Sequence, residues 1–266
     1  MNFLRVYASF AAFSLKAGMK DRFSFYAGMF ANFYSYFITY TILWAITRRF
    51  GGIDGWGFED LSVLLGLNIF AYAIAGILFR YTVYQLDNEI ASGNLDNCLV
   101  RPMGVVQYLA CRRFGSAFLG QIAVTVIFIA GALGKISYHM TAFSYVYLAA
   151  SVISGVLIQS GAMLIIGSLS FWGIRLQKIA AIFCGEIRSF TDYPLSIFPD
   201  FIRLGLTYAI PWAVINYYPS LIILRRVQTN EEFVIGILSP LIGVFFFLFS
   251  LSAFNAGLER YSGREG

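Results

Sequence analysis

Charged side chains are scarce in this 266-residue chain: they make up 12% of the sequence, whereas roughly 25% is typical of soluble domains. Hydrophobic residues make up 59% and aromatic residues 18%. A water-soluble fold cannot bury that much apolar surface and still cover itself with polar groups. The scarcity of charge therefore excludes an ordinary soluble protein and predicts a chain that lies in a lipid bilayer.

Histidine and cysteine are also rare. The single histidine, His139, stands in a short predicted loop, and Cys98, Cys111 and Cys184 have neither metal-ligand spacing nor a histidine nearby. A structural zinc site needs four ligands and a catalytic zinc site about three. The sequence predicts no metal site and gives no reason for a disulfide. The net charge of +5 lies in clusters between apolar runs, which argues against a nucleic-acid partner and is typical of membrane spans.

Long apolar runs are what the sequence has in abundance. A membrane-spanning helix needs about 20 consecutive, mostly apolar residues. Five charge-free runs fit this length: residues 23–47, 61–79, 114–134, 143–169 and 233–258.

One further span, the fifth in chain order, is expected between residues 174 and 224, where two segments compete. Residues 204–224 are the more apolar, but Pro211 and Pro219 interrupt them, and interior prolines kink or break helices. Residues 174–193 carry several charges, which suits only a span that faces protein or a wet cavity. Either choice gives six spans, with both termini on one side.

The distribution of lysine and arginine indicates which side that is. Most of them fall at the two termini and in the loops after the second and fourth spans, so both termini are predicted to be cytoplasmic. Residues 1–22 contain no cleavable signal; on a helix, Phe3, Tyr7 and Phe10 share a face. They are predicted to form an amphipathic helix in the cytoplasmic interface, with a plain extension of the first span as the alternative.

The inside loop, residues 80–113, mixes apolar and acidic residues, with a turn signal at Gly93-Asn94. Such a surface favours contact with a partner protein, although the loop is also compatible with a plain connector. The chain is not expected to bind ATP, because the glycine and hydroxyl residues that a phosphate-binding loop requires are missing around Gly134-Lys135.

Several residues within the spans invite a functional interpretation. The aromatic stripe of the first span, with Phe37 and Tyr40, fits either packing or a path for an amphiphilic substrate. Asn32 and Asn68 are polar and are expected to hydrogen-bond between helices. The predicted path consists of Phe37, Tyr40, Asn68 and Tyr72.

Charged residues of the segment 174–193 raise a second possibility. Arg188 and Asp192 are spaced to pair at i, i+4 on a helix. Glu186 is the one good candidate for a membrane-embedded proton carrier. A proton-coupled secondary transporter that works without an ATPase is therefore the alternative function.

Three stretches of sequence are similar to those of type-2 ABC exporter permeases, in a bacterial six-span branch. They are Glu89-Ile-Ala-Ser-Gly-Asn-Leu-Asp-Asn-Cys-Leu-Val-Arg-Pro102, Tyr193-Pro-Leu-Ser-Ile-Phe-Pro199 and Ile210-Pro-Trp-Ala-Val-Ile-Asn-Tyr-Tyr-Pro219. The resemblance implies an all-α membrane protein that forms a single permease domain, residues 1–266. It also implies that residues 174–193 form the fifth span and that residues 194–224 form short outer or re-entrant helices.

The resemblance further implies the partners and the sites. Two permease chains, identical or homologous, would pair with two ATPase subunits that hold ATP and Mg. This chain would then be a non-catalytic subunit of an exporter in the bacterial plasma membrane. The exporter would move a small amphiphilic or lipid-like compound outward. An outer gate is implied at Tyr193, Pro194, Pro199 and Pro211. A coupling helix would meet the ATPase through Glu89, Ile90, Gly93, Leu95, Asp96, Leu99, Arg101 and Pro102.

Overall fold

The computed structural model describes residues 9–10, 12–13, 15–16, 19–99, 103–112, 114–135 and 141–262. Apart from one isolated bridge between Ile53 and Trp56, the described residues form helices, turns and loops. The helices are α2 (Arg22–Phe50), α3 (Phe58–Ala91), α4 (Asp96–Leu99), α5 (Val105–Arg112), α6 (Phe118–Lys135), α7 (Ala142–Ser168), η1 (Leu169–Trp172), α8 (Leu176–Ala181), η2 (Ile182–Ile187), η3 (Phe190–Asp192), η4 (Leu195–Ile197), α9 (Asp200–Leu204), η5 (Gly205–Ala209), α10 (Ala213–Ile223) and α11 (Asn230–Ser262).

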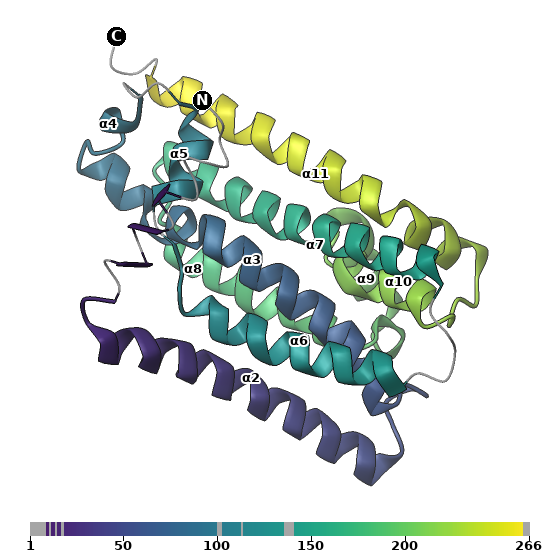
Figure 1. Cartoon of the computed structure of the whole chain (residues 1–266). Coiled ribbons are helices and arrows are strands. Elements are labelled where there is room, and N and C mark those ends of the chain that lie inside the picture. Colours follow the sequence, from purple (N-terminus) through teal and green to yellow (C-terminus); the bar gives the residue numbers. More distant parts are fainter. Residues whose placement is uncertain are drawn as a thin grey trace.

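Helix α3 is the central element of the bundle, and it packs against α2, α6, α7, α8 and α10. It has 34 residues, which corresponds to about 51 Å at 1.5 Å per residue. The hydrocarbon core of a bilayer is only about 30 Å thick. The last turns of α3 therefore extend beyond the bundle, toward α4 and α5 (Figure 1).

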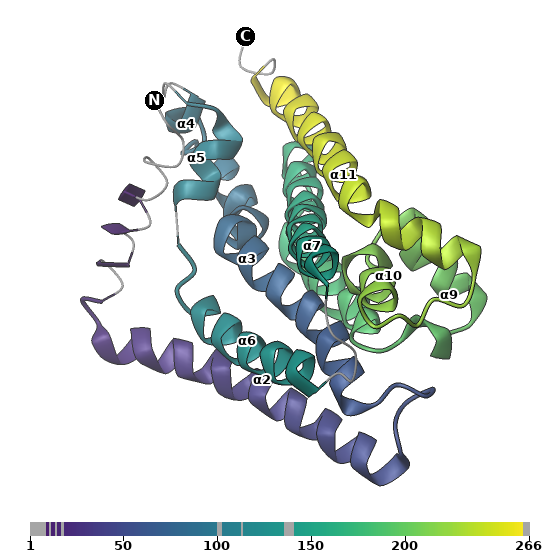
Figure 2. The same cartoon turned by 45° about the vertical axis from the view of Figure 1, so that its right-hand side comes forward.

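The two ends of the bundle are distinct. We call the end that carries α4 and α5 the loop end and the other, where α2 is joined to α3, the opposite end (Figure 2). Both described ends of the chain lie at the loop end. The ring of Phe10 lies 6.5 Å from that of Tyr108 in α5, and the Tyr261 hydroxyl donates a hydrogen bond to Asp96 at 2.9 Å. Most of the predicted N-terminal interfacial helix lies outside the described residues.

Local signals explain where the long helices begin and end. Asp21 accepts a hydrogen bond from the Ser24 amide and caps the start of α2, and Gly51 ends this helix at a φ of +76°. The Thr141 side chain caps the start of α7 in the same way. Gly173, with a φ of +78°, ends the helical run of α7 and η1.

Small residues let α7 approach α3 and α11 closely. A Cβ atom at Gly155 would lie 3.0 Å from Cβ of Ala71 in α3, and one at Gly161 would lie 2.7 Å from Oγ of Ser250 in α11. Close backbone approach of this kind is how helices associate in lipid, where there is no hydrophobic force between them.

Within the described part of the chain, four helical segments are long and apolar enough to cross a membrane: Phe58–Ala91, Phe118–Lys135, Ala142–Trp172 and Asn230–Tyr261. The all-helical membrane fold predicted from the sequence is thus confirmed, but six spans are not. Helix α2, at 29 residues, is long enough to span, but it is not among the four.

Residues 174–193 are not one regular α-helix. Helix α8 passes into the π-helix η2 and then into the short η3, a run of about 25 Å at the usual helical rise. That is less than the roughly 30 Å of a hydrocarbon core. Asn68, in the first half of α3, bonds to Thr191 and Asp192, and Leu176 N donates to Asp87 Oδ2 near the end of α3. The segment therefore runs beside the part of α3 between Asp87 and Asn68 and stops at the level of Asn68.

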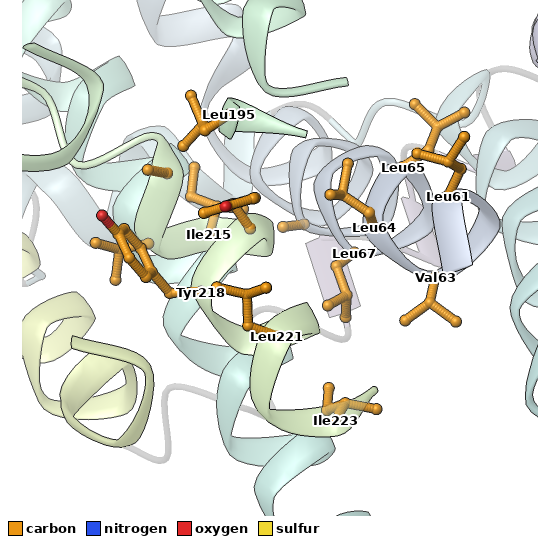
Figure 3. Close-up of a cluster of buried hydrophobic side chains, with 14 of the residues drawn as sticks. Leu61, Val63, Leu64, Leu65, Leu67, Leu195, Ile215, Tyr218, Leu221 and Ile223 are labelled. Atoms are coloured by element: carbon orange, nitrogen blue, oxygen red, sulfur yellow. The ribbon is translucent and has the colours of Figure 1, made fainter. Parts of the chain in front are cut away.

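The core beyond Asn68, toward the opposite end, is filled by the segment 194–224. Leu61, Leu64 and Leu67 of α3 meet Ile215 and Leu221 of α10 in one buried cluster (Figure 3). The helix α10 contains Pro219 without losing its helical course. The two prolines that made residues 204–224 a poor spanning candidate thus lie in a segment that packs on α3.

Candidate functional site

The loop that follows α3 folds back at a tight turn. Gly93 has a φ of +70°, a backbone geometry that suits glycine, and the Leu95 amide donates to the Glu89 carbonyl at 3.3 Å. The turn leads into α4 and then α5. Leu95 and Cys98 are buried, in a cluster that includes Leu86, Tyr108 and Leu109. The loop is therefore folded, and its buried side chains join the core of the bundle.

The predicted ATPase-coupling residues lie in different surroundings. Leu99 is 37% exposed, whereas Leu95 is fully buried within the chain. Leu95 is therefore not available to a partner, and its expected role as a contact residue is corrected: it supports the loop from inside. Arg101 and Pro102 lie outside the described residues.

The two acidic residues of the predicted set are held by tyrosines. The Tyr81 hydroxyl donates to Glu89 Oε1 at 2.5 Å, and the Tyr261 hydroxyl donates to Asp96 Oδ1 at 2.9 Å. The second bond joins the loop to the last turn of α11. A movement of the loop would therefore be transmitted directly to α11.

A hollow of about 570 Å³ lies beside this loop, between the last turns of α3 and the segment 170–177. Ile90, one of the predicted coupling residues, lines it together with Asp87, Asn88, Ala91 and Ser170 from the two sides. Leu176 N donates a hydrogen bond to Asp87 Oδ2 at 3.4 Å, and this bond joins the two segments that border the hollow.

The four residues of the predicted substrate path lie in different places. Phe37 is 42% exposed on the surface of α2, and Tyr40 is buried with its ring stacked 4.1 Å from that of Phe128 in α6. Asn68 and Tyr72 are buried one turn apart on α3. The structure thus brings Asn68 and Tyr72 together, whereas Tyr40 contributes to helix packing and Phe37 faces outward.

Asn68 is the hub of a buried polar network. Its amide nitrogen donates to Thr191 Oγ1 at 3.2 Å and to Asp192 Oδ1 at 2.7 Å, while its oxygen accepts from Gln159 Nε2 at 3.1 Å. Asn216 extends the network by donating to the Thr191 carbonyl at 2.6 Å. The network joins α3, α7, η3 and α10, so it holds together the segments that meet at mid-bundle.

Arg188 lies beside this network and is buried. It forms the predicted i, i+4 pair with Asp192, at 3.7 Å between Nη1 and Oδ1, and its Nε donates to the Cys184 carbonyl at 3.2 Å. Its guanidinium lies 4.6 Å from the centre of the Tyr72 ring. The Tyr72 hydroxyl in turn accepts a hydrogen bond from Arg80 at 3.1 Å. Two arginines therefore flank one tyrosine.

Sequence reasoning missed Gln159, Thr191 and Asn216 as members of this network. Gln159 stands inside the apolar run 143–169, and Asn216 stands inside α10. A lone amide in such a run was a usable signal, because lipid leaves an amide unsatisfied unless another helix supplies a partner.

The predicted outer-gate residues border two cavities. Tyr193, with Asp192, lines a cavity of about 140 Å³ between α2 and α3. Pro211 lines a cavity of about 480 Å³ between η5 and the aromatic face of α11. Pro194 is buried and Pro199 is exposed. Around the larger cavity, the hydroxyl of Tyr208 donates to Glu231 at 2.8 Å, and this bond raises the pKa of Tyr208.

The segment 194–224 is fixed to the start of α3 by an ion pair at the opposite end. Arg226 Nη2 lies 2.7 Å from Asp60 Oδ2, and the guanidinium lies 5.2 Å from the centre of the Trp56 ring. The two side chains are 35% and 19% exposed, so the pair is partly shielded from solvent.

Arg226→Ala is therefore expected to destabilise the protein by about 1–2 kcal/mol, since it removes a charge-assisted hydrogen bond and a cation–π contact. The matched control is Arg203→Ala, which removes a more exposed pair with Asp200 at 2.8 Å and should cost about 0.5 kcal/mol or less. Thermal unfolding in detergent measures both. Equal shifts for the two variants would show that the Arg226 pair does not anchor the segment.

Among the described residues, no group of three or more histidine, cysteine, aspartate or glutamate side chains is placed to hold a metal ion. The three cysteines are buried and form no disulfide with one another. The predicted loop residue His139 lies outside the described residues.

Comparison with known proteins gives one match. A family model described as "ABC-2 family transporter protein" matches residues 33–265. No curated protein and no solved structure matches the chain.

Proposed function

Because the chain belongs to the ABC-2 family of transporter proteins, we propose that it is the permease subunit of a bacterial exporter driven by a separate ATPase. Membrane subunits of this family are typically non-catalytic and generally pair with ATPase subunits. ATP and Mg would be bound by those partners. The observation that carries the proposal is the folded loop after α3, with the half-exposed Leu99 and the hollow beside it at the same end of the bundle.

In this proposal the loop end is cytoplasmic and the chain crosses the plasma membrane six times. Helix α2 is the first span and residues 174–193 are the fifth. The fifth is completed toward the outside by the segment 194–224, which packs on α3 beyond Asn68. A short span is tolerable there because its polar side chains bond to protein rather than to lipid.

A second permease chain, identical or homologous, would cover the face of the fifth span that carries Glu186. This side chain is exposed in the isolated chain. A carboxylate on the lipid-facing side of a span costs about 2.5–3.5 kcal/mol, so a protein surface is the better neighbour. Coverage by a partner chain also accounts for Glu186 without a proton-carrying role.

The compound moved outward would be small and amphiphilic or lipid-like. Its path would follow Asn68, Tyr72 and the aromatic face of α2, and Tyr193, Pro194, Pro199 and Pro211 would close the outer end. ATP binding would draw the two ATPases together, and the loop would pass this movement to α3 and, through the bond between Asp96 and Tyr261, to α11.

The test is purification of the tagged full-length chain from its native membrane. An ATPase subunit with a phosphate-binding loop is expected to remain bound, and transport in proteoliposomes should require ATP. If no ATPase is retained and transport follows a proton gradient instead, the chain is a secondary carrier and the proposal is wrong.

A further inference from the structure

A row of three side chains, Arg80, Tyr72 and Arg188, runs along α3 from the loop end toward mid-bundle. Arg80 donates to the Tyr72 hydroxyl at 3.1 Å, and the Arg188 guanidinium stacks 4.6 Å from the centre of the same ring. Both arginines also lie within electrostatic range of the Cys184 thiol and of the Tyr36 hydroxyl on α2. Two positive charges thus converge on one small region.

The negative charge in this region does not balance them. Among the described residues, the only ion-pair partner of Arg188 is Asp192, and Arg80 has none. Asp192 is itself shared, because Asn68 donates to the same Oδ1 atom. Glu186 is exposed on the outer face of its helix, whereas Arg188 is buried. The row therefore carries one positive charge in excess.

The hydrogen-bonding capacity of Arg188 is also incomplete. Its Nη1 atom is buried and has no hydrogen-bond acceptor among the described residues, since Asp192 lies at 3.7 Å. A buried donor without a partner is costly, and a guanidinium presents its donors in a fixed fork that fits a carboxylate or a phosphate. A region with excess positive charge and an unused guanidinium donor selects a negatively charged group.

The surroundings indicate how such a group would reach the site. Arg80 is exposed and lies nearer the loop end, where its guanidinium also contacts Tyr84 and Phe118. Asp192, the partner of Arg188, also lines the cavity of about 140 Å³ between α2 and α3. Its walls include Ile42, Leu43 and Ile46, so an apolar chain fits there better than a free ion.

We infer that the row Arg80–Tyr72–Arg188 is the recognition site for the negatively charged head group of the exported amphiphile. The head group accepts hydrogen bonds from Arg80 first and from Arg188 next, and its apolar part lies against α2. This inference rests on the proposed function for the direction of movement, and it narrows the substrate class to anionic amphiphiles such as alkyl phosphates or carboxylates.

The test is binding of a fluorescent alkyl phosphate to the full-length chain in a neutral maltoside detergent, measured by fluorescence polarisation. The variants are Arg80→Gln, in which an exposed side chain is changed, and the double variant Arg188→Gln with Asp192→Asn, which removes both charges of the buried pair together. Arg203→Gln is the control, because that arginine pairs with Asp200 on the surface.

Both site variants should weaken binding about tenfold or more, the effect expected from losing one strong charge-assisted hydrogen bond, while Arg203→Gln should bind like the wild type. An alkyl trimethylammonium probe and inorganic phosphate should fail to compete. Unchanged binding by Arg80→Gln, an equal loss in Arg203→Gln, or competition by the cationic probe would overturn the assignment. Competition by inorganic phosphate at equal concentration would show that the ligand needs no apolar chain, and it would overturn the assignment to an amphiphile. No ATPase is present in this assay, so its result does not depend on whether an ATPase drives transport by this chain.

Discussion

Replacement of Asn68 by leucine is expected to lower the stability of the protein by about 3 kcal/mol, roughly one for each hydrogen bond lost. Asn68 is fully buried and joins Gln159, Thr191 and Asp192. Leucine would leave the amide of Gln159 without its acceptor and Asp192 without its closest donor. A carboxylate that loses such a partner inside a bundle is especially costly.

Asn32→Leu is the matched control, because the chain has a second asparagine within a predicted span. Asn32 donates only to the Gly28 carbonyl of its own helix, at 3.1 Å. This change should cost about 0.5 kcal/mol or less. Thermal unfolding of the detergent-purified variants measures the contrast, with a loss of roughly 10 °C expected for Asn68→Leu. Similar midpoints for the two variants would show that the network around Asn68 does not stabilise the bundle.

Replacement of Leu95 by aspartate is expected to destroy the fold of the loop. Leu95 has no exposed surface and packs in the cluster with Leu86, Cys98 and Leu109. An unpaired carboxylate at this position costs about 3–5 kcal/mol, which is a large part of the stability of an ordinary domain. The variant should give little monodisperse protein after extraction, and limited proteolysis should cut it between α3 and α5.

Leu99→Asp places the same charge in the next turn of the loop, where the side chain is 37% exposed, and serves as the control. It should give a normal yield and resist the protease as the wild type does. If Leu95→Asp behaves like Leu99→Asp, the burial of Leu95 does not hold the loop in its fold.

Much of the fold could be predicted from the sequence, because lipid imposes a simple rule. Apolar runs of sufficient length become helices when backbone groups have no water to bond to. The runs 61–79, 143–169 and 233–258 lie within three of the four long apolar helical segments, and all but the first four residues of the run 114–134 lie within the fourth. The resemblance to type-2 ABC exporter permeases is confirmed at the level of the family.

The region from 174 to 224 was harder to predict, because hydropathy scores each residue by itself. The charges of Arg188 and Asp192 make their segment look unfit for a membrane, yet the two side chains pair with each other, and Asp192 accepts a hydrogen bond from Asn68. Pairing of groups far apart in the chain is not visible to a local pattern. For the same reason Asn32 and Asn68 looked alike in the sequence, although only Asn68 bonds to other helices.

The loop after α3 illustrates a second limit. Leu95 and Leu99 are both leucines in one short stretch, and their spacing alone did not indicate which of them faces the interior. The turn at Gly93, with its φ of +70°, decides this by directing Leu95 under the loop and Leu99 outward. A sequence pattern therefore does not show which of two nearby leucines is buried.

We propose that the exposed side of this loop holds an ATPase, and the amount of ATPase that stays bound to the permease after purification measures this contact. Leu99→Asp should be compared with Gln228→Asp, an exposed position at the opposite end. We expect Leu99→Asp to retain about a tenth or less of the ATPase held by the wild type, because a charge buried at the contact weakens it by a few kcal/mol. Gln228→Asp should retain all of it. Equal retention by the two variants, at equal permease yield, would contradict the account and make the loop a plain connector.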